Sequence, residues 1–397
     1  MVEWKKLGEV CSFFRGRSLS KKDIGEGNHQ ILLYGELYTT YGDYITHIKS
    51  KTSFEKAIVA TKLKYNDLVL PVSSTTKEAQ IGKVSVIKTK SDVYLGSDAI
   101  LLRDTFNPAY LMYYLNSTLF EKSKMECVHG TTIMHLSPTE LAQKEIPIPS
   151  LSEQSRIVSI LDTFTSSISN LKQQIEERRK QYEYERDLLL DLEGKEGVEM
   201  KKLGEICEIK NGYTPSTKKP EFWENGSIPW FTLEDIRKNG RILSDAIKHI
   251  TPTGVKKSGL FPQNSIIVST TATIGEYALI TRDFLCNQQI SCISVKEATR
   301  GKLLPKYLYY LSNSIGNWCK KNVNGGGSLL IVSTSKLNNL FIPLPPLSTQ
   351  SRIVSILDTF EQSISNLEEQ LAMREKQYEY YRNQLLTFEG EEERGKT

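Results

Sequence analysis

The sequence contains no apolar run long enough to cross a membrane, and its N-terminus, MVEWKKLGEV, lacks the apolar core of a secretion signal. We therefore expect a cytoplasmic protein with no membrane partner. Cysteine is scarce, with six residues in 397 and no CxxC pair. This spacing argues against a disulfide framework, so the cysteines are expected to be reduced and mostly buried.

Recognisable cofactor motifs are missing as well. There is no GxxxxGK[ST] segment, so ATP is not expected to bind through a P-loop. The five histidines do not fall at the spacing of metal ligands. We therefore predict no cofactor and no metal ion. With 39% hydrophobic and 25% charged residues, the chain has the composition of a soluble globular protein, long enough for two domains and connecting helices.

A long internal repeat organises the chain. The segment QSRIVSILDTF at residues 154–164 recurs unchanged at 350–360. Each copy opens a stretch, 154–194 or 350–390, in which apolar residues follow one another at alternating steps of three and four. This 3.5-residue period predicts a coiled-coil helix in each half. One such helix alone fits equally well on a globular core, but the duplication favours pairing of the two.

The predicted seam residues are Ile157, Leu161, Phe164, Ile168, Leu171, Ile175 and Leu189 in the first helix, and Ile353, Leu357, Phe360, Ile364, Leu367, Leu371 and Leu385 in the second.

The repeat extends beyond the helices. Lys5–Glu9 returns as Lys201–Glu205, and Tyr113–Leu115 returns as Tyr309–Leu311, both at an offset of 196 residues. We infer two units, each a domain followed by a helix. The interiors differ, because RGRSLSKKDIGEGN and YGELYTTYGDYI have no visible counterpart in the second half. The expected boundaries are 1–150 for the first domain, 151–197 for its helix, 198–347 for the second domain and 348–397 for the C-terminal helix.

Each domain is predicted to be a mixed α/β unit, which makes the fold class α+β. Each ends in a proline-rich strand, IPIPSLS or IPLPPLS, after which Ser152 and Ser348 are expected to cap the long helices. One short helix is predicted per domain, near residues 108–124 and 305–322. Short β-branched runs predict strands at 57–60, 68–72, 82–87, 99–103, 265–269 and 289–295.

The path of the chain favours antiparallel helices. The first helix ends near Gly194, and the second domain begins about five residues later and ends at Ser348. Each helix would be roughly 54 Å long, from about 36 residues at 1.5 Å each. Parallel helices would require the second domain to span that distance between its own termini, which a compact domain does not comfortably allow. Antiparallel pairing places the domains at opposite ends of a two-helix coiled coil with a pseudo-twofold axis.

The domains are basic and the helices are acidic. Residues 1–150 carry a net charge of +3 and residues 198–347 carry +8, whereas 151–197 carry −3 and 348–397 carry −4. A polyanion is therefore expected to meet the domains and not the helices.

This order of domain, helix, domain, helix resembles the DNA-specificity subunit of type I restriction-modification systems. The joins IPIPSLSEQSRIVSILDTF and IPLPPLSTQSRIVSILDTF carry the resemblance, with SLSKKDIGEGN and YGELYTTYG in the first domain and GYTPSTKKPEFWENGSIPWF and NSIIVSTTATIGE in the second. The resemblance implies a subunit that is not an enzyme. It implies two target-recognition domains that each read half of a bipartite site on double-stranded DNA. The helices would set the spacing and dock two methyltransferase subunits, joined in the full complex by restriction subunits.

A catalytic alternative rests on one segment. Asn107-Pro108-Ala109-Tyr110 is close to the NPPY-type motif of DNA adenine methyltransferases, but it lacks the second proline. No glycine-rich S-adenosylmethionine loop follows a predicted strand. Pro108 is better explained as the first residue of a helix, so no catalytic residue is predicted.

Candidate DNA contacts are the polar loops, because base edges are read by hydrogen bonds and phosphates by cations and hydroxyl groups. Glycines among them would allow close approach of the backbone to phosphate. In the first domain the candidates are Arg15, Arg17, Ser18, Lys21, Lys22, Tyr34, Tyr38, Tyr41, Ser73, Ser74, Thr75, Thr76, Lys77, Gly130, Thr131 and Thr132. In the second they are Tyr213, Thr214, Ser216, Lys218, Lys219, Trp230, Ser269, Thr270, Thr271, Asn287, Gln288, Gln289, Asn324, Gly325 and Gly326.

The competing interpretation is a non-catalytic adaptor whose coiled coil assembles partners and whose domains bind nucleic acid without sequence specificity. Both interpretations require the helices. Only sequence-specific recognition explains two basic domains with a shared frame and different interiors.

Overall fold

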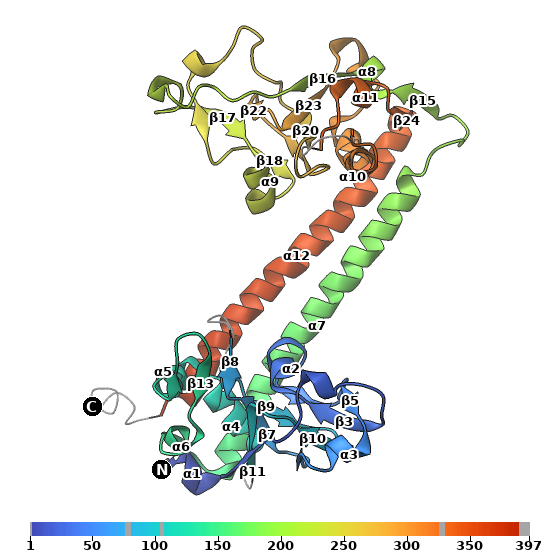
Figure 1. The fold of residues 1–397 in the computed structure, drawn as a ribbon. Helices are drawn as coiled ribbons and strands as arrows, with labels where there is room; N and C mark the ends of the chain where they lie inside the picture. The colour runs from blue at the N-terminus through green and yellow to red at the C-terminus, as the bar shows by residue number, and fades with distance from the viewer. Residues whose placement is uncertain (1, 76–80, 104–106, 325–329, 389–397) are drawn as a thin grey trace. The chain divides into compact units, whose positions relative to one another are not determined.

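The computed structural model describes residues 2–75, 81–103, 107–324 and 330–388. It divides into two compact units, one formed by Met1–Gln173 with Glu369–Thr397 and the other by Gln174–Glu368. Each unit therefore holds one globular domain and a part of each long helix, α7 (Leu151–Leu190) and α12 (Leu347–Leu386) (Figure 1). No helix in the described ranges is long and apolar enough to span a membrane.

In its described residues, the first domain contains fourteen strands and several short helices. The strands are β1 (Glu3–Lys6), β2 (Ser12–Arg15), β3 (His29–Leu32), β4 (Tyr44–Ile45), β5 (Lys51–Thr52), β6 (Thr61–Lys62), β7 (Leu68–Pro71), β8 (Ser73–Ser74), β9 (Ser85–Ile87), β10 (Val93–Leu95), β11 (Ala99–Arg103), β12 (Val128–His129), β13 (Met134–Leu136) and β14 (Glu145–Ile148). The helices are α1 (Leu7–Val10), η1 (Lys21–Asp23), α2 (Tyr34–Thr39), α3 (Phe54–Ala57), α4 (Pro108–Leu115), α5 (Thr118–Met125) and α6 (Pro138–Leu141).

The second domain contains ten strands in its described residues. They are β15 (Glu199–Lys202), β16 (Cys207–Asn211), β17 (Ile228–Phe231), β18 (Ile242–Leu243), β19 (His249–Ile250), β20 (Ser265–Ser269), β21 (Tyr277–Ile280), β22 (Leu285–Cys286), β23 (Ile290–Val295) and β24 (Phe341–Leu344). The helices are α8 (Leu203–Ile206), η2 (Pro220–Phe222), α9 (Leu233–Asn239), η3 (Pro252–Gly254), η4 (Glu297–Thr299), α10 (Pro305–Lys321) and α11 (Thr334–Asn338).

The two domains share one topology. The five-stranded sheet has the order β2-β11-β7-β9-β4 in the first domain and β16-β23-β20-β21-β18 in the second. In each, only the last strand pairs in parallel, β4 with β9 and β18 with β21. The smaller sheets also correspond, because β3 pairs in parallel with β10 as β17 does with β22. The stretches that look unrelated in sequence therefore occupy equivalent places in one shared topology.

In each five-stranded sheet the central strands are buried on both faces, and neighbouring residues of such a strand point to opposite cores. In β11, Ile100 and Leu102 enter the core that also contains Ile157 and Leu161 of α7, whereas Leu101 enters a second core around α2. In β20, Ile266 and Val268 pack toward the long helices, and Ile267 packs on the opposite side. The long helices are thus part of the domain cores.

Tyrosine hydroxyl groups fasten each domain to its long helix. Tyr113 of α4 and Tyr44 of β4 both donate to Asp162 Oδ1, at 2.7 and 2.6 Å. In the second unit, Tyr310 of α10 donates to Asp358. Asp162 and Asp358 are equivalent residues of the duplicated segment, so Tyr113 corresponds to Tyr310 and not to Tyr309. The offset of 196 residues inferred from sequence is therefore wrong by one residue within this helix.

The helix segments are antiparallel within each unit. In the first unit Phe164 of α7 stacks on Tyr381 of α12 at 5.5 Å, and Lys172 pairs with Glu375 at 2.9 Å. In the second unit Tyr182 of α7 lies 6.4 Å from the ring of Phe360. Residue numbers rise along α7 as they fall along α12, which confirms the predicted antiparallel pairing.

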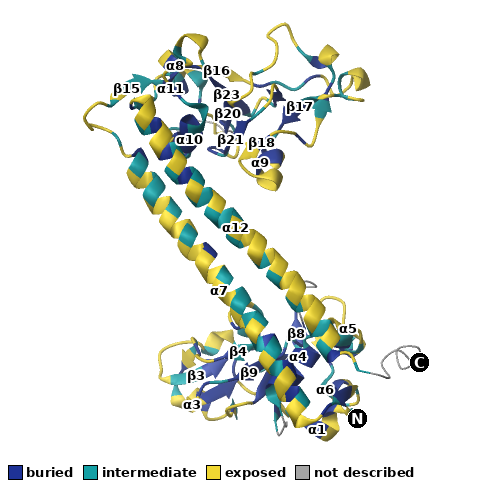
Figure 2. Ribbon diagram, turned by 180° about the vertical axis from the view of Figure 1, so that it is seen from behind, coloured by how far each residue is buried: buried dark blue, intermediate teal, exposed yellow. Residues whose placement is uncertain are grey.

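The predicted seam lies on the covered face of each helix. Every seam residue named from the sequence is buried or half-buried, whereas most of the intervening positions are exposed (Figure 2). The polar breaks in the seam have equivalent contacts in the two units. The Arg178 guanidinium lies over the Phe360 ring at 5.9 Å, and the Arg374 guanidinium lies over the Phe164 ring at 5.7 Å. Each arginine in the seam is therefore placed over an aromatic ring of the other helix, to which it is attracted.

Three local predictions are wrong. Residues 57–60 are not a strand, because Phe54–Ala57 forms helix α3 and Ile58 and Val59 are exposed on the turn after it. The helix predicted near 108–124 is two helices, since Ser117 caps α5. The first long helix is capped by Ser150, whose hydroxyl group accepts from Glu153 N at 3.3 Å, and both Ser152 and Ser348 lie inside the first turn. All six cysteines are free and buried, as expected.

Candidate nucleic-acid interface

Two polar loops of the first domain meet beside a short strand. β8 pairs with β13 in the register Ser73 with His135 and Ser74 with Met134. This pairing places residues 73–75, the described part of the predicted run 73–77, beside the β12–β13 turn that holds Gly130, Thr131 and Thr132. Thr131 and Thr132 are exposed, and Gly130 has a φ of +110°, which favours glycine. The sheet thus gathers loops that are about 55 residues apart in sequence onto one edge.

A turn after the edge strand brings in the predicted basic residues. Gly16 N donates to Ala99 O at 2.9 Å and Arg17 N donates to Leu95 O at 3.3 Å. A Cβ atom at Gly16 would lie 1.8 Å from Gly96 O, so only glycine permits this approach. The chain then passes through Ser18, at a φ of +62°, into η1 with Lys21 and Lys22. No ion pair involves Arg15, Arg17, Lys21 or Lys22 within the described ranges, and all four are exposed.

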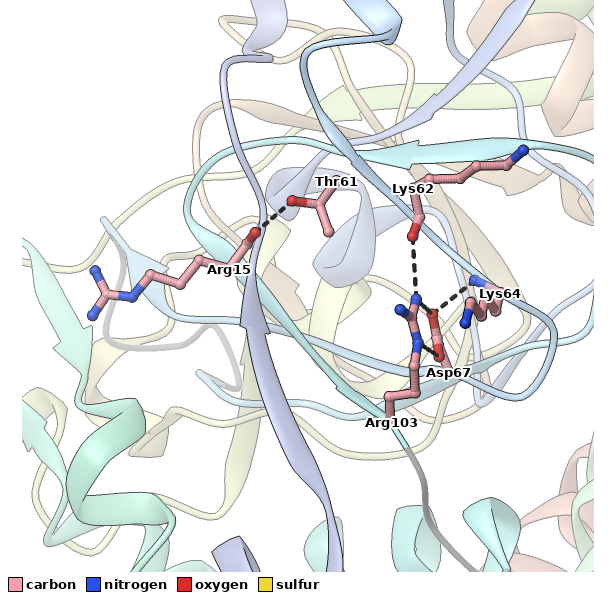
Figure 3. A network of polar contacts seen from close by, with 6 residues as sticks. All are labelled: Arg15, Thr61, Lys62, Lys64, Asp67 and Arg103. Atoms are coloured by element: carbon pink, nitrogen blue, oxygen red, sulfur yellow. Dashed lines mark hydrogen bonds and ion pairs between the residues drawn. The ribbon is translucent and has the colours of Figure 1, made fainter.

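A buried ion pair joins the last residue of β11 to the residue before β7, at the opposite end of β11 from this turn (Figure 3). The Arg103 guanidinium donates to both carboxylate oxygens of Asp67, at 2.8 and 2.6 Å, and Asp67 is 2% exposed. The Thr61 hydroxyl group donates to the carbonyl oxygen of Arg15 at 2.6 Å. The Arg15 side chain points away from this network, so its backbone is held while its guanidinium is free to meet a ligand.

A depression of about 360 Å³ lies between these loops. Its polar wall includes Arg15, Ser73, Asp98, His129 and His135. The Ser73 hydroxyl group bonds to Asp98 Oδ1 and to His135 Nδ1, each at 3.0 Å. Hydrogen-bonding groups of both charges therefore line a concave surface at the edge of the sheet, which suits recognition of a polar, planar ligand.

The second domain builds the same turn from different side chains. Gly212 N donates to Ile290 O at 2.9 Å, and Tyr213 N donates to Cys286 O at 2.8 Å. The Lys256 amine lies 4.3 Å from the centre of the Tyr213 ring. Thr214 donates to Gln288 across the two loops. Ser216, Lys218 and Lys219 follow on the surface, and the Lys219 amine lies 5.0 Å from the Phe222 ring centre.

The second cluster of predicted residues also comes together in this domain. Thr271 and Asn324 each form an antiparallel β-bridge with Ile331. In the first domain β8 and β12 likewise both pair with β13. The loop 287–289 lies next to Thr270, whose N–H donates to Gln289 O at 2.9 Å. Asn287 Oδ1 accepts from Gln289 N at 3.1 Å and so shapes that loop. Thr76, Lys77, Gly325 and Gly326 lie outside the described residues.

Several predicted contacts are support residues in the structure. Tyr41 is 6% exposed and its hydroxyl group accepts from Lys49 N at 2.9 Å. Trp230 is also 6% exposed, and its indole N–H donates to Tyr213 O at 2.9 Å. Ser269 and Thr270 are buried and internally hydrogen-bonded. Their polar groups are already used, so they shape the loops and do not present a free donor or acceptor.

The tyrosines of α2 divide in the same way. Tyr38 donates to Ser73 O at 3.0 Å, and burial holds the pKa of its phenol well above the ordinary value. Ser73 and Ser74 are themselves buried, whereas Tyr34 is half-buried and Thr75 is exposed. Tyr38 therefore stabilises the backbone at Ser73 through this hydrogen bond.

Sequence reasoning missed Asp98, His135 and Asn211. Asn211 stands 196 residues after Arg15, so the repeat offset contained the signal that would have found it. No comparable signal marked Asp98, which lies between β10 and β11 and joins the lining of the depression only through the fold.

The fold and these loops define a class of protein: a duplicated chain with two domains and two long helices, in which equivalent polar loops of the two domains share a backbone frame and differ in side chains. The family model described as the type I restriction modification DNA specificity domain matches residues 1–178 and again residues 195–373. The chain therefore belongs to this family of specificity subunits, as its sequence led us to expect.

Two relatives come from Escherichia coli. The chain is 44% identical over 210 residues to the type I restriction enzyme EcoprrI specificity subunit, covering 50% of this chain and 52% of the relative. It is 40% identical over 267 residues to the EcoR124I/EcoR124II specificity subunit, covering 62% and 64%. The chain thus spans between about half and just under two thirds of the length of these relatives.

A solved structure supports the fold along the whole chain. The type I restriction-modification S subunit from M. genitalium matches with a TM-score of 0.56 at 15% identity, covering 98% of this chain and 96% of that one. At this identity the likeness concerns the fold alone.

Proposed function

We propose that this chain is the DNA-specificity subunit of a type I restriction-modification complex. Each domain reads one half of a bipartite, asymmetric site on double-stranded DNA. The antiparallel helices set the spacing and dock two methyltransferase subunits, and restriction subunits join the complete assembly. The chain itself carries no catalytic group in this proposal, since methyl transfer and cleavage belong to its partners.

One observation carries the proposal: both domains build the same turn and the same loop edge, but from different side chains. Gly16 and Gly212 make equivalent backbone hydrogen bonds, while Arg17 stands where the other domain has Tyr213. A shared frame with different side chains is what reading two different half-sites requires. A protein that contacted only phosphate would have no need of the difference.

The exposed cations support a polyanionic ligand. Arg17, Lys21 and Lys22 follow one another at the rim of the first domain without ion pairs in the described part of the chain. Lys218 and Lys219 occupy the corresponding stretch of the second domain. Lysine and arginine in this position neutralise phosphates and make affinity fall as salt rises. These residues are therefore assigned to the backbone of the duplex and not to its bases.

An adaptor that binds nucleic acid without sequence preference is the second candidate, favoured only by the exposed apolar residues of the helices, such as Leu188 and Met373. Those residues serve partner docking equally well in the first proposal. The two candidates differ in whether a bound duplex has a defined sequence.

The experiment is selection from a random duplex library by the full chain, alone and together with methyltransferase subunits. We expect a motif of two unlike half-sites separated by an unspecified gap. Replacing residues 1–150 with those of another family member should change one half-site, and replacing 198–347 should change the other. The donor domain must keep a tyrosine at the position of Tyr113, so that the joint to Asp162 forms.

Fluorescence anisotropy at rising salt separates the candidates further. An adaptor would bind every duplex alike and lose affinity in parallel for all of them. Selection of no motif under conditions where the protein binds DNA would refute the proposed function.

A further inference from the structure

Backbone hydrogen bonds align the loop edges of the two domains residue by residue. Val72 N donates to Asp98 O, and Thr270 N donates to Gln289 O, both at 2.9 Å. Leu136 N donates to Val72 O at 2.8 Å, and Val332 N donates to Thr270 O at 2.9 Å. Asp98 therefore corresponds to Gln289, and the next residue along each short strand makes Ser73 correspond to Thr271.

The other two positions follow from the same frame. Arg15 and Asn211 are the last residues of β2 and β16, directly before the equivalent glycines. His135 pairs with Ser73 as Ile331 pairs with Thr271. Four positions thus line the edge in both domains, although the second domain's members are scattered differently along the sequence.

The chemistry at these positions differs in kind. In the first domain, arginine, aspartate and histidine surround the depression. In the second, Asn211 and Gln289 offer amide groups, and Ile331 replaces the histidine. The first domain thus has a cationic donor and a separate anionic acceptor. The second domain has two neutral amide groups, each of which can donate and accept.

Asp98 is the unusual member of the first set. It is exposed, and it has a φ of +60°, a conformation that aspartate and asparagine tolerate best among residues other than glycine. Ser73 donates to one of its carboxylate oxygens, and within the described ranges no cation pairs with it. A carboxylate at a surface for DNA repels phosphate, and a hydrogen bond accepted from a base amine offsets that repulsion.

We propose that Arg15 and Asp98 of the first domain read one G·C pair, and that Asn211 and Gln289 at the equivalent positions of the second domain read an A·T pair. This inference rests on the proposed function. Arginine pairs with guanine O6 and N7, and aspartate accepts from cytosine N4. Asparagine and glutamine pair with adenine N6 and N7. Ser291 donates to Asn211 Oδ1 at 2.7 Å, which orients that amide with its N–H₂ group outward.

The test is selection of bound sequences from a random duplex library by the full chain and by single variants. Asp98→Asn keeps the φ of +60° accessible and still accepts from Ser73, so it should fold. We expect it to lose preference for cytosine at one position of one half-site, by about 10- to 100-fold. Arg15→Gln should lose preference for guanine by a similar factor, at the same base pair.

Variants in the second domain should act on the other half-site only. Gln289→Glu removes the amide donor and keeps the acceptor, so adenine should be selected less often there, with the first half-site unchanged. Lys21→Gln is the matched control: Lys21 is an exposed cation assigned to phosphate, and its loss should weaken binding to all sequences without changing the motif.

The outcomes separate this inference from the proposed function. If the wild-type chain selects no motif, both the proposed function and this inference are wrong. A wild-type motif that stays unchanged in Asp98→Asn, Arg15→Gln and Gln289→Glu leaves the proposed function standing and overturns the assignment of these residues. A change in binding strength alone, with circular dichroism showing folded protein, overturns it as well.

Discussion

A single glycine in each domain allows the turn after the edge strand to lie close to the backbone of the neighbouring loop. Gly16 and Gly212 lie in stretches that otherwise share almost no residues, yet both are required because the backbone passes within contact of the neighbouring loop. A Cβ atom at Gly212 would lie 2.2 Å from Cys286 O, much like the 1.8 Å found at Gly16. The two domains thus share the residue that sets the backbone and differ in the side chains around it.

Gly16→Ala should therefore destabilise the first unit by about 1–3 kcal/mol, because the loops must move apart to admit the methyl group. Calorimetry should show the transition of one unit at lower temperature, and Gly212→Ala should shift the other. Gly35→Ala is the matched control, since a Cβ atom there meets no atom within 4 Å. Equal transition temperatures for Gly16→Ala and Gly35→Ala would contradict this account.

At the scale of elements, the joint between domain and helix depends on a neutral phenol beside a carboxylate. Burial, together with the Asp162 carboxylate, raises the pKa of Tyr113 well above its ordinary value, and the same holds for Tyr310 beside Asp358. A raised pKa means that the phenol's contribution to stability is complete below about pH 10 and is lost as pH rises beyond it. The joint is therefore intact throughout the neutral range.

Tyr113→Phe should lower the free energy of unfolding by about 1.5–3 kcal/mol, the usual contribution of a hydrogen bond to a charged acceptor. Tyr310→Phe should have a similar effect in the other unit. The comparison is with Tyr184→Phe, whose side chain is 68% exposed on α7. Urea denaturation at neutral pH measures the difference, and a loss no larger than that of Tyr184→Phe would mean that the phenol hydroxyl groups do not stabilise the joint.

The sequence was sufficient for the elements that repeat themselves. The long helices, their antiparallel pairing and strands such as 265–269 follow from periodicity and chain path. The two-helix form of 108–124 did not follow, because a single serine cap at Ser117 interrupts an otherwise helical run. Residues 57–60 were misassigned because β-branched residues on an exposed turn look like a buried strand.

The candidate interface was predicted less completely. Polar loops such as Ser73–Thr75 and Gly130–Thr132 are found by composition, but composition does not separate a buried Tyr41 from an exposed Thr131. Asp98 became visible only when the sheet placed it beside Ser73. Base-reading positions depend on which loops the fold brings together, and short-range patterns carry little of that information.

For the whole molecule, the two helices join the units and are expected to set the distance between half-sites. Insertion of seven residues after Leu171 and after Leu367 preserves the seam and lengthens each helix by about 10.5 Å, or roughly three base pairs. The half-sites selected from a random duplex library should stay the same while the gap between them grows.

An insertion of two residues in one helix alone is the control, because it rotates the seam out of register and should reduce folding or partner docking. A folded seven-residue variant that selects the original gap would show that the domains set the distance.

The first unit combines an N-terminal and a C-terminal segment of the chain, which affects how the protein folds during its synthesis on the ribosome. Tyr378, Leu385, Leu386 and Phe388 pack on the core that includes Ile157 and Leu161, although almost the entire second unit is synthesised in between. At about 5–20 residues per second, that delay is roughly 10–40 s. The second unit, a continuous segment, can be complete while the apolar face of the first part of α7 is still uncovered. The first domain to emerge is thus the last to be finished, and its nascent helix remains open to other partners until the C-terminal segment arrives.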